Sequence, residues 1–259
     1  MISRFCAKRK DVLSMAITWG TFGAVHLISL LLAILLNVGL YFLLKGRSRR
    51  TQIVTLGILS FMGIAAILYN LLMWGSPLEY LPLHLCSLSA LLLPIAVLTR
   101  KEIPCNLLLL WSLGAFVALI LNYSMAETEI LGWPFFFYYF PHLLECGIPI
   151  LLFKLGLCKL SPRCAFSTIG ITLVVYTLIH FINVWINRYC TEQGILDSSG
   201  ELIQVNYMFS ITPENPLLAL FYQWIPHPYW YMLPAVAVVA LYLGGIYGVQ
   251  ALVKRKKRT

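Results

Sequence analysis

Charged side chains are scarce in this sequence. Asp, Glu, Lys and Arg together make up 11% of the 259 residues, whereas apolar residues make up 60%. A soluble domain of this length usually carries about a quarter charged residues, because it must present a hydrated surface. The shortage excludes an ordinary soluble domain and indicates a chain that contacts lipid.

The sequence also lacks the short motifs of the common enzyme classes. It contains no dinucleotide-binding GxGxxG, no GxSxG elbow, no HExxH pair and no Walker sequence. Its seven cysteines form no CxxC pair, and no two of its five histidines stand four residues apart. We therefore expect no disulfide framework, no metal ion and no cofactor.

What the sequence has instead is a series of apolar runs of about twenty residues, the length needed to cross a bilayer as a helix. Only a helix or a closed barrel satisfies the backbone polar groups in lipid. The pattern predicts an all-α polytopic membrane protein, with residues 1–259 as a single transmembrane domain. The seven expected helices cover residues 20–44, 52–74, 81–99, 103–121, 135–157, 165–187 and 230–253.

The positive charges lie beside these runs, and 13 of the 19 Lys and Arg residues fall within 4–10, 45–50 and 254–258. Such flanking clusters set topology and contact anionic lipid heads, so we expect no nucleic acid partner. The connections after the first, third and fifth helices and the C-terminal tail are basic, and the others are acidic. The positive-inside rule therefore predicts an outside N-terminus and an inside C-terminus, although cluster 4–10 opposes it. Residues 1–15 are interpreted as a segment that lies along a membrane surface.

The longest connection, residues 188–229, falls on the predicted outer side. A connection of this length in a compact protein usually has a function or is disordered. It holds many aromatic residues, and amphipathic rings favour the headgroup zone. We interpret it as a lid over the outer face.

Four histidines fall in the outer half of the predicted helices. With a rise of 1.5 Å per residue, His26, His84, His142 and His180 lie roughly 5–10 Å below the outer ends. Ionisable groups inside a membrane are costly and usually face a cavity or pathway, which predicts a shared polar pocket. The alternative is that each imidazole is a satisfied polar group that bonds a neighbouring helix.

Two cysteines are candidate nucleophiles, because a thiol needs a nearby base to form a thiolate at neutral pH. Cys86 stands two residues after His84, about 200° around a helix, so its base must come from another helix. His142, Glu145 and Cys146 are spaced three and four residues apart and share a helix face. Glu145 is a candidate for orienting the imidazole. Cys146 is a rival nucleophile.

A polar stripe marks the sixth predicted helix. His180, Asn183 and Asn187 recur at intervals of three and four residues, so they occupy one face. The stripe either lines the pocket or bonds a neighbouring helix. Asn183, His180 and Asn206 are candidate donors to an oxyanion.

Several segments resemble a known group of proteins. These are LPLHLC at 81–86, His26 at the head of the first predicted helix, NYMF at 206–209, and PHPYWY at 226–231. Together they resemble the bacterial YwaF-like membrane proteins. That group is similar to the transmembrane protein 164 acyltransferases and, more distantly, to the androgen-induced membrane hydrolases. The resemblance covers nearly the whole chain, and the LPLHLC segment is its most specific part.

The resemblance implies a multi-pass protein of the cell membrane, in a bacterium the plasma membrane. It implies acyl transfer between phospholipids and lysophospholipids through a Cys on one helix and a His on another, at positions that match Cys86 and His142. We therefore expect a lipid acyltransferase or acyl hydrolase with a thioester intermediate, and His84, Glu145, His180, Asn183, Asn206 and His26 around the pocket. The alternative is a carrier or receptor-like binder that uses the same histidines without catalysis.

Overall fold

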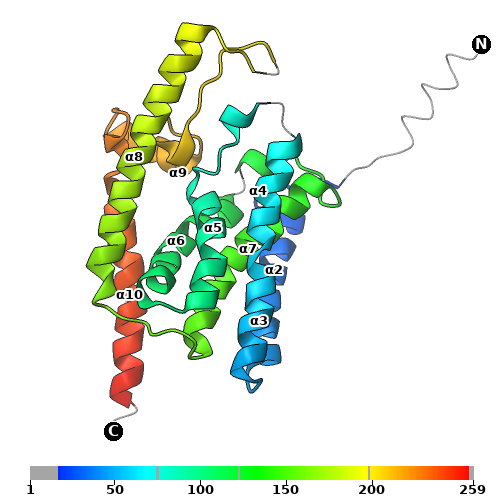
Figure 1. Ribbon diagram of the computed structural model, residues 1–259, viewed down its shortest axis with the longest axis vertical. Helices are drawn as coiled ribbons and strands as arrows, with labels where there is room; N and C mark the ends of the chain where they lie inside the picture. The colour runs from blue at the N-terminus through cyan, green and yellow to red at the C-terminus, as the bar shows by residue number, and fades with distance from the viewer. Residues whose placement is uncertain (1–16, 74–75, 122, 198, 257–259) are drawn as a thin grey trace, which may run out of the picture.

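The computed structural model describes residues 17–73, 76–121, 123–197 and 199–256, which form a helical bundle (Figure 1). The predicted surface segment 1–15, with the basic cluster 4–10, thus lies outside the described residues. Within the described ranges there are two isolated β-bridges and no strand. The α-helices are α2 (Ala24–Leu44), α3 (Arg49–Ser60), α4 (Met62–Met73), α5 (Leu85–Thr99), α6 (Glu102–Leu121), α7 (Trp133–Lys154), α8 (Cys164–Gln193), α9 (Pro216–Trp224) and α10 (Pro234–Lys256). Short 3-10 turns are η1 (Pro77–Glu79), η2 (Tyr123–Met125), η3 (Tyr207–Phe209) and η4 (Trp230–Met232).

Six helical segments of the described chain are long and apolar enough to cross a membrane. They are Ala24–Leu44, Arg49–Met73, Glu102–Leu121, Trp133–Lys154, Cys164–Gln193 and Trp230–Val253. The second joins α3 and α4, and the last joins η4 and α10. The protein is therefore an all-helical, multi-pass membrane protein.

The third predicted helix, 81–99, is shorter than expected. A helix does occur there, but α5 starts at Leu85 and has 15 residues, fewer than the roughly 20 that a bilayer core requires. Pro82 lacks an N–H and holds the preceding residue extended, so the helix cannot begin at Leu81. His84 is extended, with ψ of 154°, and forms the N-cap. The change moves Cys86 into the first turn of α5.

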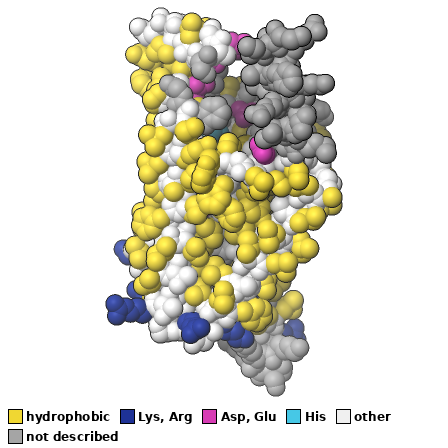
Figure 2. All heavy atoms as spheres, turned by 90° about the vertical axis from the view of Figure 1, so that its right-hand side faces the viewer, with side chains coloured by type: hydrophobic (Ala, Val, Ile, Leu, Met, Phe, Trp, Pro, Cys, Tyr) yellow, Lys and Arg dark blue, Asp and Glu magenta, His cyan; other side chains and the backbone are white. Residues whose placement is uncertain are grey.

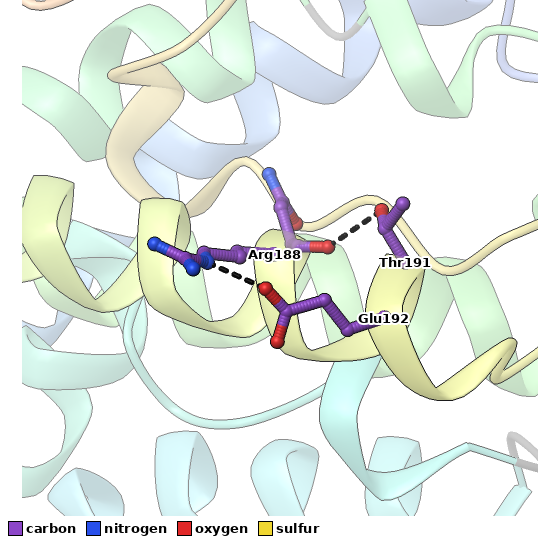
Figure 3. Close-up of polar contacts among 4 residues, drawn as sticks. Arg188, Thr191 and Glu192 are labelled. Atoms are coloured by element: carbon purple, nitrogen blue, oxygen red, sulfur yellow. Dashed lines mark hydrogen bonds and ion pairs between the residues drawn. The ribbon is translucent and has the colours of Figure 1, made fainter.

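The sixth predicted helix, 165–187, is longer than expected. α8 has 30 residues and ends only at Gly194, whose φ of 62° closes the helix in the left-handed conformation. Its last turns carry an ion pair between Arg188 and Glu192, whose Nε and Oε1 are 2.7 Å apart (Figure 3). The Thr191 hydroxyl donates to the Asn187 carbonyl in the same turns. The expected loop 188–229 therefore starts at residue 194, and it contains η3 and α9.

Charges of opposite sign occupy opposite ends of the bundle, as Figure 2 shows for one face. We call one end the basic end. The α2–α3, α5–α6 and α7–α8 connections and the last turn of α10 lie there, and these segments carry Lys and Arg residues. The other, the acidic end, holds η1, the α6–α7 connection and the segment after α8. A broad band of apolar side chains separates the two ends on the face shown.

The centre of the bundle is formed by α4, α5, α6 and α7, and α8 and α10 contact it through α6. Helices in lipid approach closely where small residues meet. A Cβ atom placed on Gly63 of α4 would lie 2.5 Å from the Cβ of Ala90 on α5. Gly147 of α7 is covered in the same way by the Asn37 side chain of α2. These two glycines set the spacing of the central helices.

Replacing Gly63 with Ala should destabilise the bundle, because the new methyl group meets the backbone and side chain of Ala90. Overpacking of this kind costs about 1–3 kcal/mol. Gly170→Ala on α8 is the matched control, since nothing lies within 4 Å of its added Cβ. The midpoint of thermal denaturation is measured for both variants in the same detergent. Equal midpoints for the two would contradict the close α4–α5 contact.

Candidate functional site

His142 lies on α7 and is buried among the central helices. Its Nδ1 is 2.7 Å from the backbone carbonyl of Tyr138, one turn earlier. A carbonyl only accepts, so Nδ1 carries the proton and the neutral ring keeps its lone pair on Nε2. The Tyr138 ring packs on the imidazole with centroids 4.3 Å apart and fixes its plane. This imidazole is therefore oriented with a free basic nitrogen.

Cys86 lies in the first turn of α5 and is half-buried. Its Sγ lies beside the backbone N–H groups of Cys86 and Ser87 and beside the Ser87 hydroxyl. The first N–H groups of a helix have no partner within the helix, and the helix dipole is positive at this end. This position favours a negative charge on sulfur more than the middle of a helix would.

Cys86 and His142 lie at the same level of the bundle. Gly63 marks that level, because its built Cβ meets Ala90 of α5 and lies 3.7 Å from Oε1 of Glu145 on α7. Cys86 precedes Ala90 by one turn, and His142 precedes Glu145 by nearly one turn. α5 and α7 both start at the acidic end and run toward the basic end (Figure 1). The Cys86 thiol is also within electrostatic range of both Glu145 and Tyr138.

Glu145 is buried, with 4% of its surface exposed, and its Oε2 has no hydrogen-bond partner. It does not hold Nδ1 of His142, because the Tyr138 carbonyl occupies that nitrogen. Ser89 of α5 is also buried, and its Oγ has no partner. Ser89 follows Cys86 by three residues and therefore lies on a neighbouring part of the same helix face. The packed helices α5 and α7 thus each carry one buried side-chain oxygen without a partner.

Cys146, the rival thiol, lies against a different helix. Its Sγ is 4.0 Å from the carbonyl of Ser112 on α6, and the residue is buried. It sits in the middle of α7, where the backbone N–H groups are already paired within the helix. Cys86 thus lies among the unpaired N–H groups of a helix start, and Cys146 does not.

The predicted polar stripe on α8 binds a segment that we call the strap, residues 203–210. Asn183 pairs with both backbone groups of Tyr207, at 2.8 and 3.1 Å. Asn187 does the same for Val205, at 3.0 and 2.6 Å. Nδ1 of His180 lies 3.1 Å from the Ser210 hydroxyl. The stripe therefore anchors the outer loop to α8.

The strap also reaches the start of α5. Nδ1 of His84 accepts from the backbone N–H of Met208 at 3.3 Å, and its ring packs against Phe209. The Tyr207 hydroxyl donates to the carbonyl of Leu78. Burial raises the pKa of Tyr207 to about 12, which keeps this hydroxyl neutral and able to donate. The strap therefore clamps the turn that leads into Cys86.

Two further predicted pocket residues hold the chain itself. Nε2 of His26 lies 2.9 Å from the Leu119 carbonyl, and its Nδ1 accepts from the N–H of Phe22 at 2.9 Å. Asn206 donates to Thr212 and to the carboxylate of Glu214 at 2.7 Å. Both side chains already have hydrogen-bond partners, and none of the partners named here lies on α5 or α7.

Tyr138 and Ser89 were not predicted as site residues. Tyr138 stands four residues before His142 and Ser89 three residues after Cys86, so helical spacing alone could have indicated both. Across the described residues, no group of three His, Cys, Asp or Glu side chains is arranged to hold a metal ion.

A comparison with curated proteins and one with solved structures found no match. A comparison with family models found one that matches residues 10–247, described as the TMEM164 family. This match confirms the relation to the transmembrane protein 164 proteins that the LPLHLC segment indicated, while the YwaF-like assignment stays a prediction. Because the matched range covers nearly all of the sequence, the chain belongs to the TMEM164 family.

Proposed function

We propose that this protein moves acyl groups between membrane lipids, or to water, through a Cys86–His142 pair. One observation carries the proposal. Cys86 stands in the first turn of α5 at the level of His142, whose Nδ1–H is held by the Tyr138 carbonyl so that Nε2 is free to accept a proton. A thiol at the start of one helix, and an imidazole with a free nitrogen at the same level of a neighbouring helix, are the two groups that nucleophilic catalysis requires.

We also propose seven membrane crossings, with α5 as the short third one. An odd number of crossings puts the two termini on opposite sides, and the basic end faces the cytoplasm by the positive-inside rule. The C-terminus is then inside and the N-terminus outside. The first turn of α5 lies toward the acidic end and therefore in the outer leaflet, near the depth of phospholipid ester groups.

In the proposed reaction, the Cys86 thiol gives its proton to Nε2 of His142, and Sγ attacks the ester carbonyl carbon of a phospholipid. The bond from that carbon to the glycerol oxygen breaks, and His142 returns the proton to the oxygen. The products are a lysophospholipid and a thioester on Cys86. The hydroxyl of another lysophospholipid, or water, then loses its proton to His142 and attacks the thioester carbon. The carbon–sulfur bond breaks, and the proton returns to Sγ.

Replacing Cys86 with Ala should lower the rate of acyl transfer by about 10³-fold or more, because no other thiol of the described residues shares this setting. His142→Ala should lower it by about 10²–10⁴-fold, the usual contribution of a general base. The measurement uses purified protein in vesicles that contain a phospholipid with a labelled acyl chain and an unlabelled lysophospholipid. Mass spectrometry should also find the labelled chain on Cys86, in a form that hydroxylamine removes.

Cys146→Ala is the matched control, because it removes a buried thiol that lies against α6, and it should transfer acyl groups like the wild type. Loss of transfer in Cys146→Ala together with normal transfer in Cys86→Ala would reverse the assignment. A carrier that binds lipid without chemistry would show no acyl thioester in any of these proteins.

The proposed orientation predicts opposite accessibility at the two ends. Ser199→Cys at the acidic end should react with a membrane-impermeant maleimide added to intact cells, because the residue is exposed. Thr51→Cys at the basic end, also exposed, should react only after the cells are permeabilised. The wild type supplies the background of native cysteines. Labelling of Thr51→Cys in intact cells would overturn the orientation.

A further inference from the structure

Three buried side-chain atoms of the described chain have no hydrogen-bond partner: Oδ1 of Asn37, Oγ of Ser89 and Oε2 of Glu145. Unpaired polar groups are costly at membrane depth, and nearly all other buried polar side chains of the helices bond a backbone carbonyl. Asn37 is nevertheless half satisfied, because its amide donates to the carbonyls of Ala33 and Leu143. Ser89 and Glu145 remain, and they belong to α5 and α7, which pack against each other.

No Lys or Arg side chain that the structure describes forms an ion pair with Glu145. In the described residues the one ion pair joins Arg188 and Glu192, at the far end of α8, and the Lys and Arg side chains of the loops gather at the basic end. Its carboxyl lies beside Gly63 of α4, and the thiols of Cys86 and Cys146 are within electrostatic range. A carboxyl group buried at membrane depth without a cation is carried in its neutral form, because the anion cannot be solvated there. A neutral carboxyl has one O–H to donate.

The proposed reaction needs such a donor. When Sγ of Cys86 attacks an ester, the carbonyl oxygen takes on a negative charge, and no bulk water is present to stabilise it. Donors that are already in place at that position usually supply a large part of catalysis. A carboxylic acid kept neutral by an apolar site can serve as one of them. The carboxyl of Glu145 lies within electrostatic range of the Cys86 thiol, where the charge would form.

We propose that Glu145, in its protonated form and assisted by the Ser89 hydroxyl, binds the carbonyl oxygen of the acyl ester and stabilises the oxyanion that forms when Cys86 attacks. The inference rests on the proposed function and assigns Glu145 a role different from orienting His142. The O–H of Glu145 keeps its proton throughout and gives only a hydrogen bond, so the proton transfers remain between Cys86, His142 and the two lipid oxygens.

Two substitutions at one position test the role. Glu145→Gln keeps a neutral N–H donor of nearly the same shape and should transfer acyl groups within about tenfold of the wild-type rate. Glu145→Leu fills the space without a donor and should lose about 10²–10³-fold, the usual effect of removing one oxyanion donor. Asn37→Leu is the matched control, because it also removes a buried, partly unpaired polar group from a central helix, and its rate should stay near the wild-type value.

A second measurement separates the role from a change in folding or in the thiol. Alkylation of Cys86 by iodoacetamide displaces iodide and forms no oxyanion. Its rate should be unchanged in Glu145→Leu although acyl transfer falls. A parallel loss of alkylation and transfer would overturn the inference, since Glu145 would then act on the thiol or on the fold. Loss of acyl transfer in the Glu145→Gln variant would also overturn the inference, because the reaction would then need the carboxylate.

The two proposals fail in different ways. Suppose that Cys86 acquires the labelled acyl chain in the wild type, and at the same rate in the Glu145→Leu variant. The role of Glu145 is then wrong and the proposed function stands. If wild type and Cys86→Ala behave alike in acyl transfer, the proposed function is wrong and the role of Glu145 falls with it.

Discussion

The pairing of polar groups inside an apolar bundle is the constraint from which the other features of this structure follow. Lipid offers no hydrogen bonds, so each polar side chain on a membrane helix must find a partner within the protein. Most do so through a backbone carbonyl, either one turn earlier on the same helix or on another element. His26 reaches Leu119, and the Tyr139 hydroxyl donates to Ser29. These bonds tie α2 to α6 and α7, which explains why such residues occur in apolar helices without any catalytic role.

The same constraint shows where chemistry is plausible. A polar residue whose partners are all present has no capacity left for a substrate, and His26, Asn183 and Asn187 are of this kind. His142 is different because a carbonyl takes one ring nitrogen and leaves the other free. Glu145 and Ser89 are different because each keeps an unpaired buried atom. His142, Glu145 and Ser89 belong to the neighbouring helices α5 and α7, and in the proposed reaction a bound ester would supply the partners that they lack.

The sequence predicted the helical class, the places of the helices and the separation of charge between the two ends, because all three depend on apolar runs and their flanks. It overestimated the third helix, since Pro82 lies in an apolar run that hydropathy counts as helix. It also underestimated α8, whose last turns are polar and therefore resemble a loop, although Arg188 and Glu192 are four residues apart and stabilise a helix.

The candidate site was harder to predict than the fold. Four histidines at similar depth were expected to share one pocket, but depth along a helix does not give the direction in which a side chain points, nor the partner that it finds. Only the packing of α4, α5 and α7 at Gly63 brings Glu145 to the side of Cys86. Likewise, the proton position on His142 depends on Tyr138 on the same helix, which local spacing could have indicated.

The LPLHLC segment can now be understood residue by residue. Pro82 delays the helix, so His84 becomes the N-cap and Cys86 falls among the unpaired N–H groups of the first turn. His84 is then free to accept from Met208, which is one of two successive residues with positive φ, at 53° and 54°. That conformation costs about 1–2 kcal/mol per residue and persists only where several contacts hold it. Asn183 and His84 supply such contacts from α8 and α5. The histidine nearest to Cys86 in sequence thus holds the strap, and in the proposed reaction the base comes from α7.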